Sequence, residues 1–440
     1  MIISTRAVPS EVKQLAEIIN ANNGRLFIVG GWVRDQFLGR DPKEIDLLIL
    51  GLELSTGLTL LPNPKQVISN EPVFLIDGGF EVAFGRREIS TGKGKGNFEF
   101  IAATDVSIEE DLRRRDLTVN AMAMDILTGI VIDPFGGVND IARGILRHVS
   151  DSFVESPERV LRLATDSVRT GFTIDPATIA ICQSMVNDFH LIPKEQLRLH
   201  FLKAMGMPGN NAGNWFRVML ATGWLVHFPL WGALVNCWQD QANHPCGDAF
   251  EHTCHVMDQA TTAQMRIAAA CHDLGKPITA RGDGTFPGHA GQPEIFNAAL
   301  DVFFDDVDSL WRRQVVELCT RHMDHLSLEG VPLTKRIVRR FVSRLEWVSL
   351  ADLAELVRCD LSGRPPLPPR TSAVMDQIIA IAADMENHNE MEPLLTGKDL
   401  IKMGLKPGPM FGEILRLVEN VRFEGLIDDK AGAIEFINRL

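Results

Sequence analysis

The 440-residue sequence has no tyrosine and no long apolar run, and its seven cysteines are scattered. Because no window approaches the roughly 20 apolar residues of a membrane span, we expect no transmembrane segment. The N-terminus, MIISTRAVPSEVKQL, lacks the basic and apolar regions of a signal peptide. The cysteines show no CxxC spacing, which is typical of reduced thiols. We therefore predict a cytoplasmic protein that does not bind membranes.

Positive charge is also scarce in this sequence. The net charge is −13, which argues against bulk nonspecific binding of nucleic acid. Basic clusters persist at residues 111–118 (DLRRRDLT) and 311–314 (WRRQ), so a local basic groove is compatible with the composition. Without tyrosine, stacking on nucleic-acid bases would depend on Phe, Trp, His or Arg.

The length indicates more than one domain. Residues 24–150 alternate short apolar strands with glycine-rich turns. From about residue 151 the strand signals stop and helix-period apolar positions take over. We predict an α+β protein with an α/β head followed by an all-helical remainder. The predicted parts are a head at 1–150, a neck at 151–213, a helical domain at 214–385 and a C-terminal helical region at 386–440.

Two acids follow a glycine turn in the stretch GGWVRDQFLGRDPKEIDLLI, residues 30–49. Glu44 and Asp46 begin an apolar run, and alternating residues of a strand point to the same side. Paired carboxylates suit hard divalent cations, which can clamp the attacking and leaving oxygens of a phosphoryl transfer. Glu81, on a later predicted strand, offers a third acid. Each motif alone is most often a turn or a solvated strand edge, but their order favours a phosphoryl-transfer site.

Several segments in this order resemble the class II tRNA nucleotidyltransferase and bacterial poly(A) polymerase family. They are GGWVRD, KEIDLL, EEDLRRRDLTVNAMA, DPFGGVNDIARGILRHVSDSF and SPERVLRLA. The resemblance covers residues 22–440. It implies a polymerase-beta-like head and template-independent addition of CMP and AMP to tRNA 3′ ends. It also implies Mg²⁺ in the head, and a tRNA or other RNA 3′ end, ATP and CTP as partners.

The resemblance assigns roles to single residues. Glu44, Asp46 and Glu81 would be the catalytic acids, and the first two would hold Mg²⁺. The nucleotide-binding residues that it implies are Gly30, Gly31, Arg34, Asp35, Arg115, Asp116, Asn120, Glu155, Ser156, Arg159 and Arg162.

Some positions depart from the family pattern. Glu44 stands where the family usually has Asp, and its longer side chain is expected to slow catalysis because Mg²⁺ demands near-ideal geometry. Ser156 replaces the Asp of the nucleotide-selecting motif, and a weaker acceptor is expected to relax the choice among nucleotides. Thr165 and Asp166 replace an arginine and a phenylalanine of relatives.

Histidines and aspartates recur in five later segments: FEHTCH, CHDLGK, FPGHAG, TRHMDH and RCDLSGR. Imidazoles and carboxylates together suit Ni²⁺, Mn²⁺, Co²⁺ or Fe, and such a metal activates water and polarises phosphate. One such histidine alone is usually structural, and we interpret His244 in this way, but the series favours a metal site. The predicted ligands are His252, His272, Asp273, His289, His322 and Asp360.

The order and the flanks of these segments resemble the HD phosphohydrolase domain that is fused to many bacterial members of the same family. This implies phosphatase or 2′,3′-cyclic phosphodiesterase activity on nucleotides or RNA ends. Lys276, three residues after Asp273, and Arg364 would steady the substrate's charge. The sequence favours two active sites over a hydrolase with a head that only binds RNA or nucleotide, and over a non-catalytic tRNA-binding protein. The number of metals in the HD site and the oligomeric state stay open.

Overall fold

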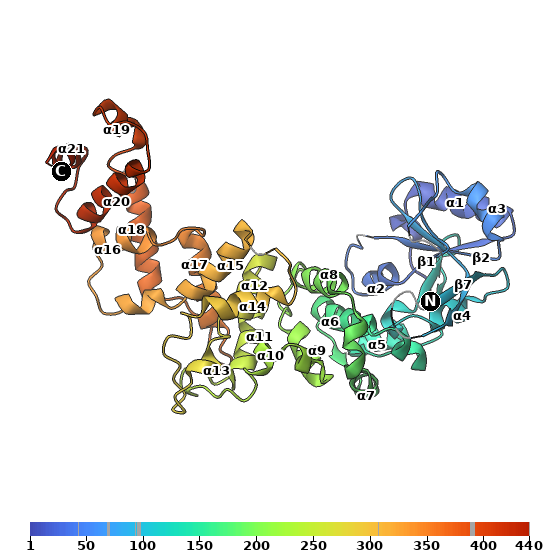
Figure 1. The fold of residues 1–440 in the computed structure, drawn as a ribbon. Helices are drawn as coiled ribbons and strands as arrows, with labels where there is room; N and C mark the ends of the chain where they lie inside the picture. Colours follow the sequence, from blue (N-terminus) through green and yellow to red (C-terminus); the bar gives the residue numbers. More distant parts are fainter. Residues whose placement is uncertain are drawn as a thin grey trace. The chain divides into compact units, whose positions relative to one another are not determined.

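A computed structural model of the chain describes residues 1–42, 44–67, 71–92, 94, 98–306, 308–387 and 392–439. Figure 1 shows its fold. The chain divides into two compact units, Met1–Gly232 (unit 1) and Ala233–Leu440 (unit 2). A sheet-containing head followed by a largely helical remainder confirms the predicted α+β class. Within the described ranges, no helix is long and apolar enough to cross a membrane.

The head in unit 1 is built on a seven-stranded sheet with the order β3-β4-β5-β2-β1-β8-β9. Neighbouring strands are antiparallel, except that β2 and β5 run parallel. The central strand β1 is apolar on both faces: Leu26 and Ile28 enter one core cluster, and Phe27 and Val29 enter another. The strands of this sheet are β1 (Arg25–Val29), β2 (Asp46–Leu50), β3 (Lys65–Gln66), β4 (Val73–Leu75), β5 (Glu81–Phe84), β8 (Ala123–Asp125) and β9 (Val131–Ile132).

Two further strand pairs lie outside this sheet. The antiparallel pair joins β6 (Arg86–Ser90) to β7 (Phe98–Ala102). The parallel pair joins β10 (Ile145–Leu146) to β11 (Thr173–Ile174). The expectation that strands end near residue 151 is therefore wrong at β11. Two residues are too few to leave a periodic signal in the sequence.

Ten helices are described in unit 1, and α6 is central among those of the neck, where it packs against α8 and α9. Its residues Val160, Leu161, Leu163 and Ala164 are fully buried. The helices are α1 (Ser10–Ala21), α2 (Gly31–Phe37), α3 (Leu54–Leu60), α4 (Ile108–Arg113), α5 (Gly137–Arg143), α6 (Glu158–Thr170), α7 (Pro176–Ser184), α8 (Lys194–Met205), α9 (Asn214–Ala221) and α10 (Pro229–Gly232).

In unit 2, α12 packs against α11, α15 and α17. The buried alanines 268–270 make α12 narrow, and small side chains let helix axes approach closely. A smaller apolar cluster around Leu395 and Leu400 forms the core of the C-terminal helices. The helices are α11 (Ala249–Gln259), α12 (Ala263–Cys271), α13 (Lys276–Thr279), α14 (Pro293–Asp301), α15 (Leu310–Arg321), α16 (Lys335–Val342), α17 (Leu350–Ser362), α18 (Ala373–Asn387), α19 (Gly397–Lys402), α20 (Met410–Phe423) and α21 (Lys430–Asn438).

Candidate active sites

Two of the predicted acids begin neighbouring strands of the head sheet. Asp46 is the first residue of β2 and lies in register with Glu81, the first residue of the parallel strand β5. Glu44 precedes β2 and is exposed, so the prediction that Glu44 and Asp46 both lie on the strand is wrong for Glu44. We refer to Glu44, Asp46 and Glu81 as the head acids. They come from two chain segments that meet where the parallel strands β2 and β5 begin.

The head acids affect one another electrostatically. Desolvation raises the pKa of the Asp46 carboxyl, which Arg115 opposes and Glu44 reinforces. Desolvation also raises the pKa of Glu81, and the charges of Asp46 and Glu44 add to that increase. A divalent cation between these carboxylates would offset both effects because it favours their charged forms. The donor set therefore fits Mg²⁺.

The predicted glycine turn links the end of β1 to α2 beside these acids. Gly30 has a φ of 74°, a left-handed conformation that favours glycine. A Cβ there would lie 3.1 Å from Nη1 of Arg115 and 3.9 Å from Oδ2 of Asp46. A Cβ on Gly31 would lie 3.3 Å from Nη2 of Arg34. The two glycines thus leave open the space between the acids and the arginines.

Arg34 is buried and has three side-chain partners. Its guanidinium donates to Asp35 (2.9 Å), Asn120 (2.6 Å) and Asp166 (3.3 Å). Burial alone would lower the pKa of Arg34, but Asp166 and Asp35 reverse that effect and raise it. Asp166 entered the sequence analysis only as a departure from relatives, because nothing in its local sequence shows that it meets Arg34.

Asp116 and Arg115 lie next to this group. Asp116 accepts from the backbone N–H of Leu117 (2.8 Å) and from the Asn120 amide (3.3 Å), and it pairs with Arg162 (3.2 Å). Arg115 pairs with the buried Asp111 at 3.4 Å. The structure thus brings the predicted phosphate-turn residues and the RRRD segment together.

The segment predicted to select the nucleotide lies where η3 (Asp151–Glu155) meets α6. Glu155 and Ser156 are half-buried. Arg159 is buried, and its guanidinium donates to the backbone carbonyls of Ser152 (2.5 Å) and Arg114 (2.7 Å). Arg162 is more open, with 44% of its side chain exposed. In this structure Arg159 therefore supports the backbone, and Arg162 is the more accessible arginine of the pair.

The predicted histidines and aspartates of unit 2 converge on one buried centre. Three overlapping groups have their ligand atoms within 4.8 Å of one another, and two of these groups contain Asp273. The ligands come from α11, the α12–α13 junction, the loop before α14, the end of α15, and α17. We refer to this set as the His/Asp cluster: His252, His272, Asp273, His289, His322 and Asp360.

Asp273 occupies the middle of the His/Asp cluster. Its Oδ2 lies 3.1 Å from Nε2 of His272 and 3.5 Å from Nε2 of His252. Its Oδ1 lies 3.2 Å from Nε2 of His289 and 4.0 Å from Nε2 of His322. One carboxylate therefore offers a different oxygen to each of two histidine pairs.

Backbone carbonyls orient all four imidazoles of the cluster. A neutral imidazole carries its proton on one nitrogen only, so an Nδ1 that donates leaves the Nε2 lone pair for a metal. The carbonyls that accept from Nδ1 belong to Gly363 for His252 (3.1 Å), Ala269 for His272 (2.7 Å), Phe286 for His289 (2.8 Å) and Cys319 for His322 (2.7 Å).

The inward-facing atoms of the cluster fit a transition metal. In the part of the chain that the structure describes, Nε2 of His252 and of His272 are buried and have no hydrogen-bond partner. His252 Nε2 faces Oδ1 of Asp360 at 3.0 Å. The Nε2 lone pair of His252 and the carboxylate of Asp360 repel each other, and a cation between them would remove this repulsion. Imidazole nitrogens with carboxylate oxygens are ligands that Ni²⁺, Mn²⁺, Co²⁺ and Fe accept.

Protonation in the cluster follows from burial and from neighbouring charges. Burial and the charge of His272 lower the pKa of His322 to about 3, and burial lowers the pKa of His252. Burial alone would raise the pKa of Asp273, but His272 and Lys276 hold it well below its usual range. For His272 the balance is reversed, because Asp273 outweighs burial and raises its pKa. Apart from His272, these groups hold the protonation states that metal ligation requires.

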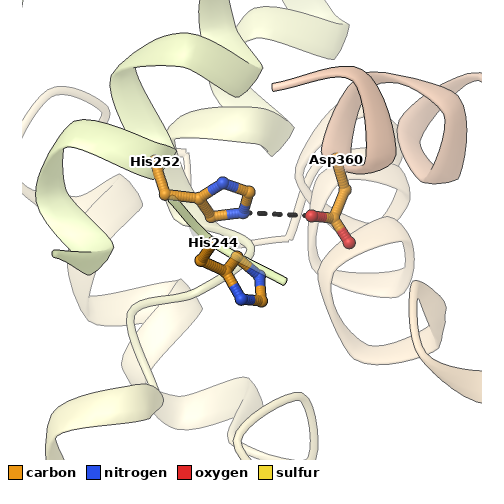
Figure 2. Close-up of side chains that lie close together, drawn as sticks. All are labelled: His244, His252 and Asp360. Atoms are coloured by element: carbon orange, nitrogen blue, oxygen red, sulfur yellow. Dashed lines mark ion pairs between the residues drawn. The ribbon is translucent and has the colours of Figure 1, made fainter. Parts of the chain in front are cut away.

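His244 lies against the cluster, although the sequence favoured a purely structural role for it. Its ring meets that of His252 edge-on at 4.9 Å between centroids. Figure 2 shows His244 beside His252 and Asp360, with which it forms one of the groups that could hold a metal. Burial lowers the pKa of His244 to about 3. Sequence reasoning could have included His244 among the candidate ligands because it lies only eight residues before His252.

A pocket of about 530 Å³ opens onto the cluster. Lys276, Arg281 and Arg364 line it and supply positive charge. Lys276 pairs with Asp273 (2.5 Å), and Arg364 pairs with Asp360 (2.9 Å). One wall depends on Gly275, because a Cβ there would lie 2.1 Å from the carbonyl oxygen of His289. The pocket combines cations with the cluster, as a site for a phosphate ester requires.

Comparison with known proteins agrees with both units of the fold. Residues 26–147 match the poly(A) polymerase head domain. The chain is 39% identical to the multifunctional CCA protein of Nitrosococcus oceani over 279 residues, which are 61% of this chain and 66%, just under two thirds, of that protein. It is 35% identical to the multifunctional CCA protein of Laribacter hongkongensis over 353 residues, which are 78% of this chain and 85% of that protein.

Solved structures show the same fold along nearly the whole chain. The Bacillus stearothermophilus CCA-adding enzyme in complex with CTP is 21% identical, with a TM-score of 0.58 over 98% of this chain and 97% of that one. The Thermotoga maritima CCA-adding enzyme complexed with tRNA is 20% identical, with a TM-score of 0.57 over 99% of this chain and 97% of that one. On the sequence alignments, this chain belongs to the multifunctional CCA protein family.

Proposed function

We propose that the head is a template-independent nucleotidyltransferase that adds CMP and AMP from CTP and ATP to tRNA 3′ ends. The observation that carries this proposal is the parallel register of Asp46 with Glu81 beside the Gly30–Gly31 turn. The names of the relatives and of the similar structures support the same activity. Nucleotide transfer needs carboxylates that can hold a metal and cationic side chains around the triphosphate. The head has carboxylates and arginines close together.

The head residues have distinct tasks in this proposal. Glu44 and Asp46 would hold Mg²⁺, which when bound stabilises charge on the reacting phosphate. Glu81 carries the third negative charge, beside Asp46. Arg34 and Arg115 orient the triphosphate through fork-shaped N–H donors, while Gly30 leaves room for the backbone approach. Glu155 and Ser156 directly precede α6, and Arg162 lies in its first turns, where all three would face the base.

The test of the head is nucleotide addition to tRNA that lacks its last three nucleotides. Each labelled nucleoside triphosphate is supplied separately with Mg²⁺, and the extended products are resolved by length. We expect CMP and AMP addition, and the product length distinguishes CCA, CC, A and poly(A). The absence of any extension with active tRNA substrate would overturn the proposal for the head.

We also propose that the His/Asp cluster is the centre of an HD-type phosphohydrolase that acts on phosphomonoesters or 2′,3′-cyclic phosphates. The cluster fits Ni²⁺, Mn²⁺, Co²⁺ or Fe, and a metal bound there would lower the pKa of a water molecule and polarise the phosphate. Asp273 would hold the metal together with the histidines, because its two oxygens each face a histidine pair. Lys276, Arg281 and Arg364 hold the phosphate in the pocket.

The test of this second site is metal content together with hydrolysis. Purified protein should carry, or be activated by, one of these transition metals and should release phosphate from a generic phosphomonoester or open 2′,3′-cyclic AMP. Hydrolysis at an unchanged rate by metal-free protein would contradict the whole assignment.

A second candidate function keeps only the hydrolase active, with a head that binds RNA or nucleotide. The observation that favours it is that Arg34 and Arg159 are both occupied by partners within the protein. The extension assay separates the two candidates, since a binding-only head retains tRNA or CTP but yields no longer product.

A further inference from the structure

One face of α6 is directed at the nucleotide-binding residues of the head. Arg159, Arg162 and Asp166 are spaced i, i+3 and i+7, so they lie along one side of the helix. Arg159 binds the backbone carbonyl of Arg114, and Arg162 pairs with Asp116. Asp166 is the third member of this row, and no role in nucleotide transfer follows from the resemblance for an acid at its position.

Asp166 closes a triangle of side chains with Arg34 and Asn120. Its Oδ1 accepts from Nη1 of Arg34 at 3.3 Å, and its Oδ2 accepts from Nδ2 of Asn120 at 2.8 Å. The third side is formed by Nη1 of Arg34, which donates to Oδ1 of Asn120 at 2.6 Å. Asp166 is only 7% exposed, and Arg169 supports it from the next turn of α6 at 3.4 Å.

We propose that Asp166 is a positioning residue for nucleotide binding, which fixes the direction of the Arg34 guanidinium and the orientation of the Asn120 amide. This inference rests on the proposed nucleotide transfer by the head. An amide can be turned end for end, and its orientation is set by its partners. Here Asp166 and Asp116 both accept from Nδ2 of Asn120, which leaves Oδ1 to accept from Arg34.

The triangle also determines how Arg34 can act on a triphosphate. Asp35 and Asp166 both compensate its charge, so its effect on phosphate depends on where its N–H groups point. A misplacement of about 1 Å can cost about 100-fold in rate. Loss of Asp166 should therefore weaken binding of the nucleotide and leave binding of RNA outside this triangle unchanged.

The test compares Asp166→Ala and Asp166→Asn with Asp175→Asn. Asp175 is a matched control because it is also an acid of the neck, where it pairs with Arg147 and caps α7. We expect Asp166→Ala to raise KM for CTP and ATP about 10- to 100-fold, with KM for RNA and hydrolysis in unit 2 unchanged. Asp166→Asn keeps an acceptor for Arg34 and should lie between wild type and Asp166→Ala. Asp175→Asn should lower Tm without changing KM for the nucleotide.

A double-variant cycle with Asn120→Ala shows whether the triangle acts as a unit. If it does, Asp166→Ala should add little to the KM of the Asn120→Ala protein. A lower Tm of Asp166→Ala with unchanged KM for CTP and ATP would show a structural brace only and overturn the inference. Equilibrium binding of CTP in the presence of Mg²⁺ is also measured, so that failure of the transfer proposal can be distinguished from failure of the positioning role of Asp166. A wild type that binds CTP without extending RNA ends the transfer proposal, and the effect of Asp166→Ala on that binding still decides the role of Asp166.

Discussion

The head acids and the His/Asp cluster are both proposed to hold metal ions, but their surroundings differ. Asp46 is exposed at the start of the interior strand β2, although its carboxyl is desolvated enough to raise its pKa, whereas His252 and His272 have no exposed surface. A backbone carbonyl accepts from Nδ1 of each of the four cluster imidazoles, whereas Asp46 and Glu81 are positioned by the register of β2 with β5. In the proposed functions, substrate phosphates would complete the open set of oxygens in the head, whereas the side chains of unit 2 would supply most of the ligands of their metal.

The electrostatics of the two sites differ in the same way. Desolvation and mutual repulsion raise the pKa values of Asp46 and Glu81. In unit 2, His272 and Lys276 hold the pKa of Asp273 well below the usual range despite burial, and the contact with His252 and the charge of Arg364 do the same for Asp360. We therefore expect the head to bind its ion with the nucleotide, and the His/Asp cluster to retain its ion through purification.

The largest expected effect is on the head. Asp46→Ala should reduce nucleotide transfer by at least about 1,000-fold, equivalent to about 4 kcal/mol of transition-state stabilisation, because it removes a metal ligand. Hydrolysis in unit 2 should not change, and Glu44→Asp should keep or raise the transfer rate. The exposed Glu17→Ala on α1 is the control for removal of a surface acid. Normal transfer by Asp46→Ala would show that β2 does not hold the catalytic metal.

The complementary prediction concerns the His/Asp cluster of unit 2. The double variant His272→Ala, Asp273→Ala should lose bound transition metal and reduce hydrolysis at least about 100-fold, while nucleotide transfer stays within about 2-fold. Metal analysis of the purified protein and phosphate release give the two measurements. His255→Ala, one turn after His252 on α11, is the matched control and should retain both. Parallel loss of transfer would mean that the two sites are not independent.

A smaller effect is expected from pH, because acidification should destabilise the His/Asp cluster in unit 2 and leave the head nearly unaffected. Burial lowers the pKa of His252, and lowers that of His322 to about 3, whereas the unfolded value is about 6.5. As pH falls below about 6.5, the unfolded chain binds protons that the folded cluster does not, so unit 2 loses up to about 1.4 kcal/mol per pH unit for each such histidine. His272, whose pKa is raised, opposes this in part.

The head should resist the same acidification. Arg114 and Arg115 outweigh burial and lower the pKa of Asp111, so its contribution is present above about pH 4 and is lost only as pH falls through its folded value. Calorimetry of metal-free protein at about pH 7.5 and 5 should show a lower unfolding temperature for unit 2 and a nearly constant one for unit 1. Equal shifts of both transitions would contradict this account.

The smallest expected effect concerns the choice of nucleotide. Ser156→Asp should sharpen discrimination between CTP or ATP and the other nucleotides by about 10-fold, equivalent to about 1.4 kcal/mol, because an ionised acceptor is restored. Single-nucleotide addition rates with all four triphosphates give the ratio. A wild-type protein that already rejects UTP and GTP by several orders of magnitude would remove the basis of this prediction.

The sequence predicted those parts of the sites that are local. Gly30, Gly31 and Asp46 lie within one short stretch that runs from the end of β1 through α2 to β2, so pattern and spacing were sufficient to predict that they are neighbours, although their roles stay a prediction. The candidate ligands of the His/Asp cluster were predictable because each stands in a distinctive segment, although their roles as ligands stay a prediction. Three of the carbonyls that accept from the imidazoles lie three residues earlier in the chain, whereas the carbonyl of Gly363 meets His252 only through long-range packing.

Long-range partners were the part that sequence reasoning missed. Asp166 is 132 residues from Arg34 along the chain, and only the packing of α6 brings them together. Glu44 was expected on β2, yet the strand begins at Asp46, and strand ends are set by pairing with neighbours rather than by alternation alone. Arg159 was predicted from the resemblance to bind the nucleotide, whereas its buried guanidinium donates to two backbone carbonyls.

The close contact between Gly275 and the carbonyl of His289 has a consequence for how this protein tolerates mutation. Gly275 has an ordinary negative φ of −78°, so its backbone could accommodate alanine. The obstacle is space, because a methyl group would overlap the segment that carries His289. A change that removes no charge, no lone pair and no proton would therefore separate Asp273 from one of its histidines. In a survey of variants, Gly275 would behave as if it were a ligand, although it has no side chain with which to bind.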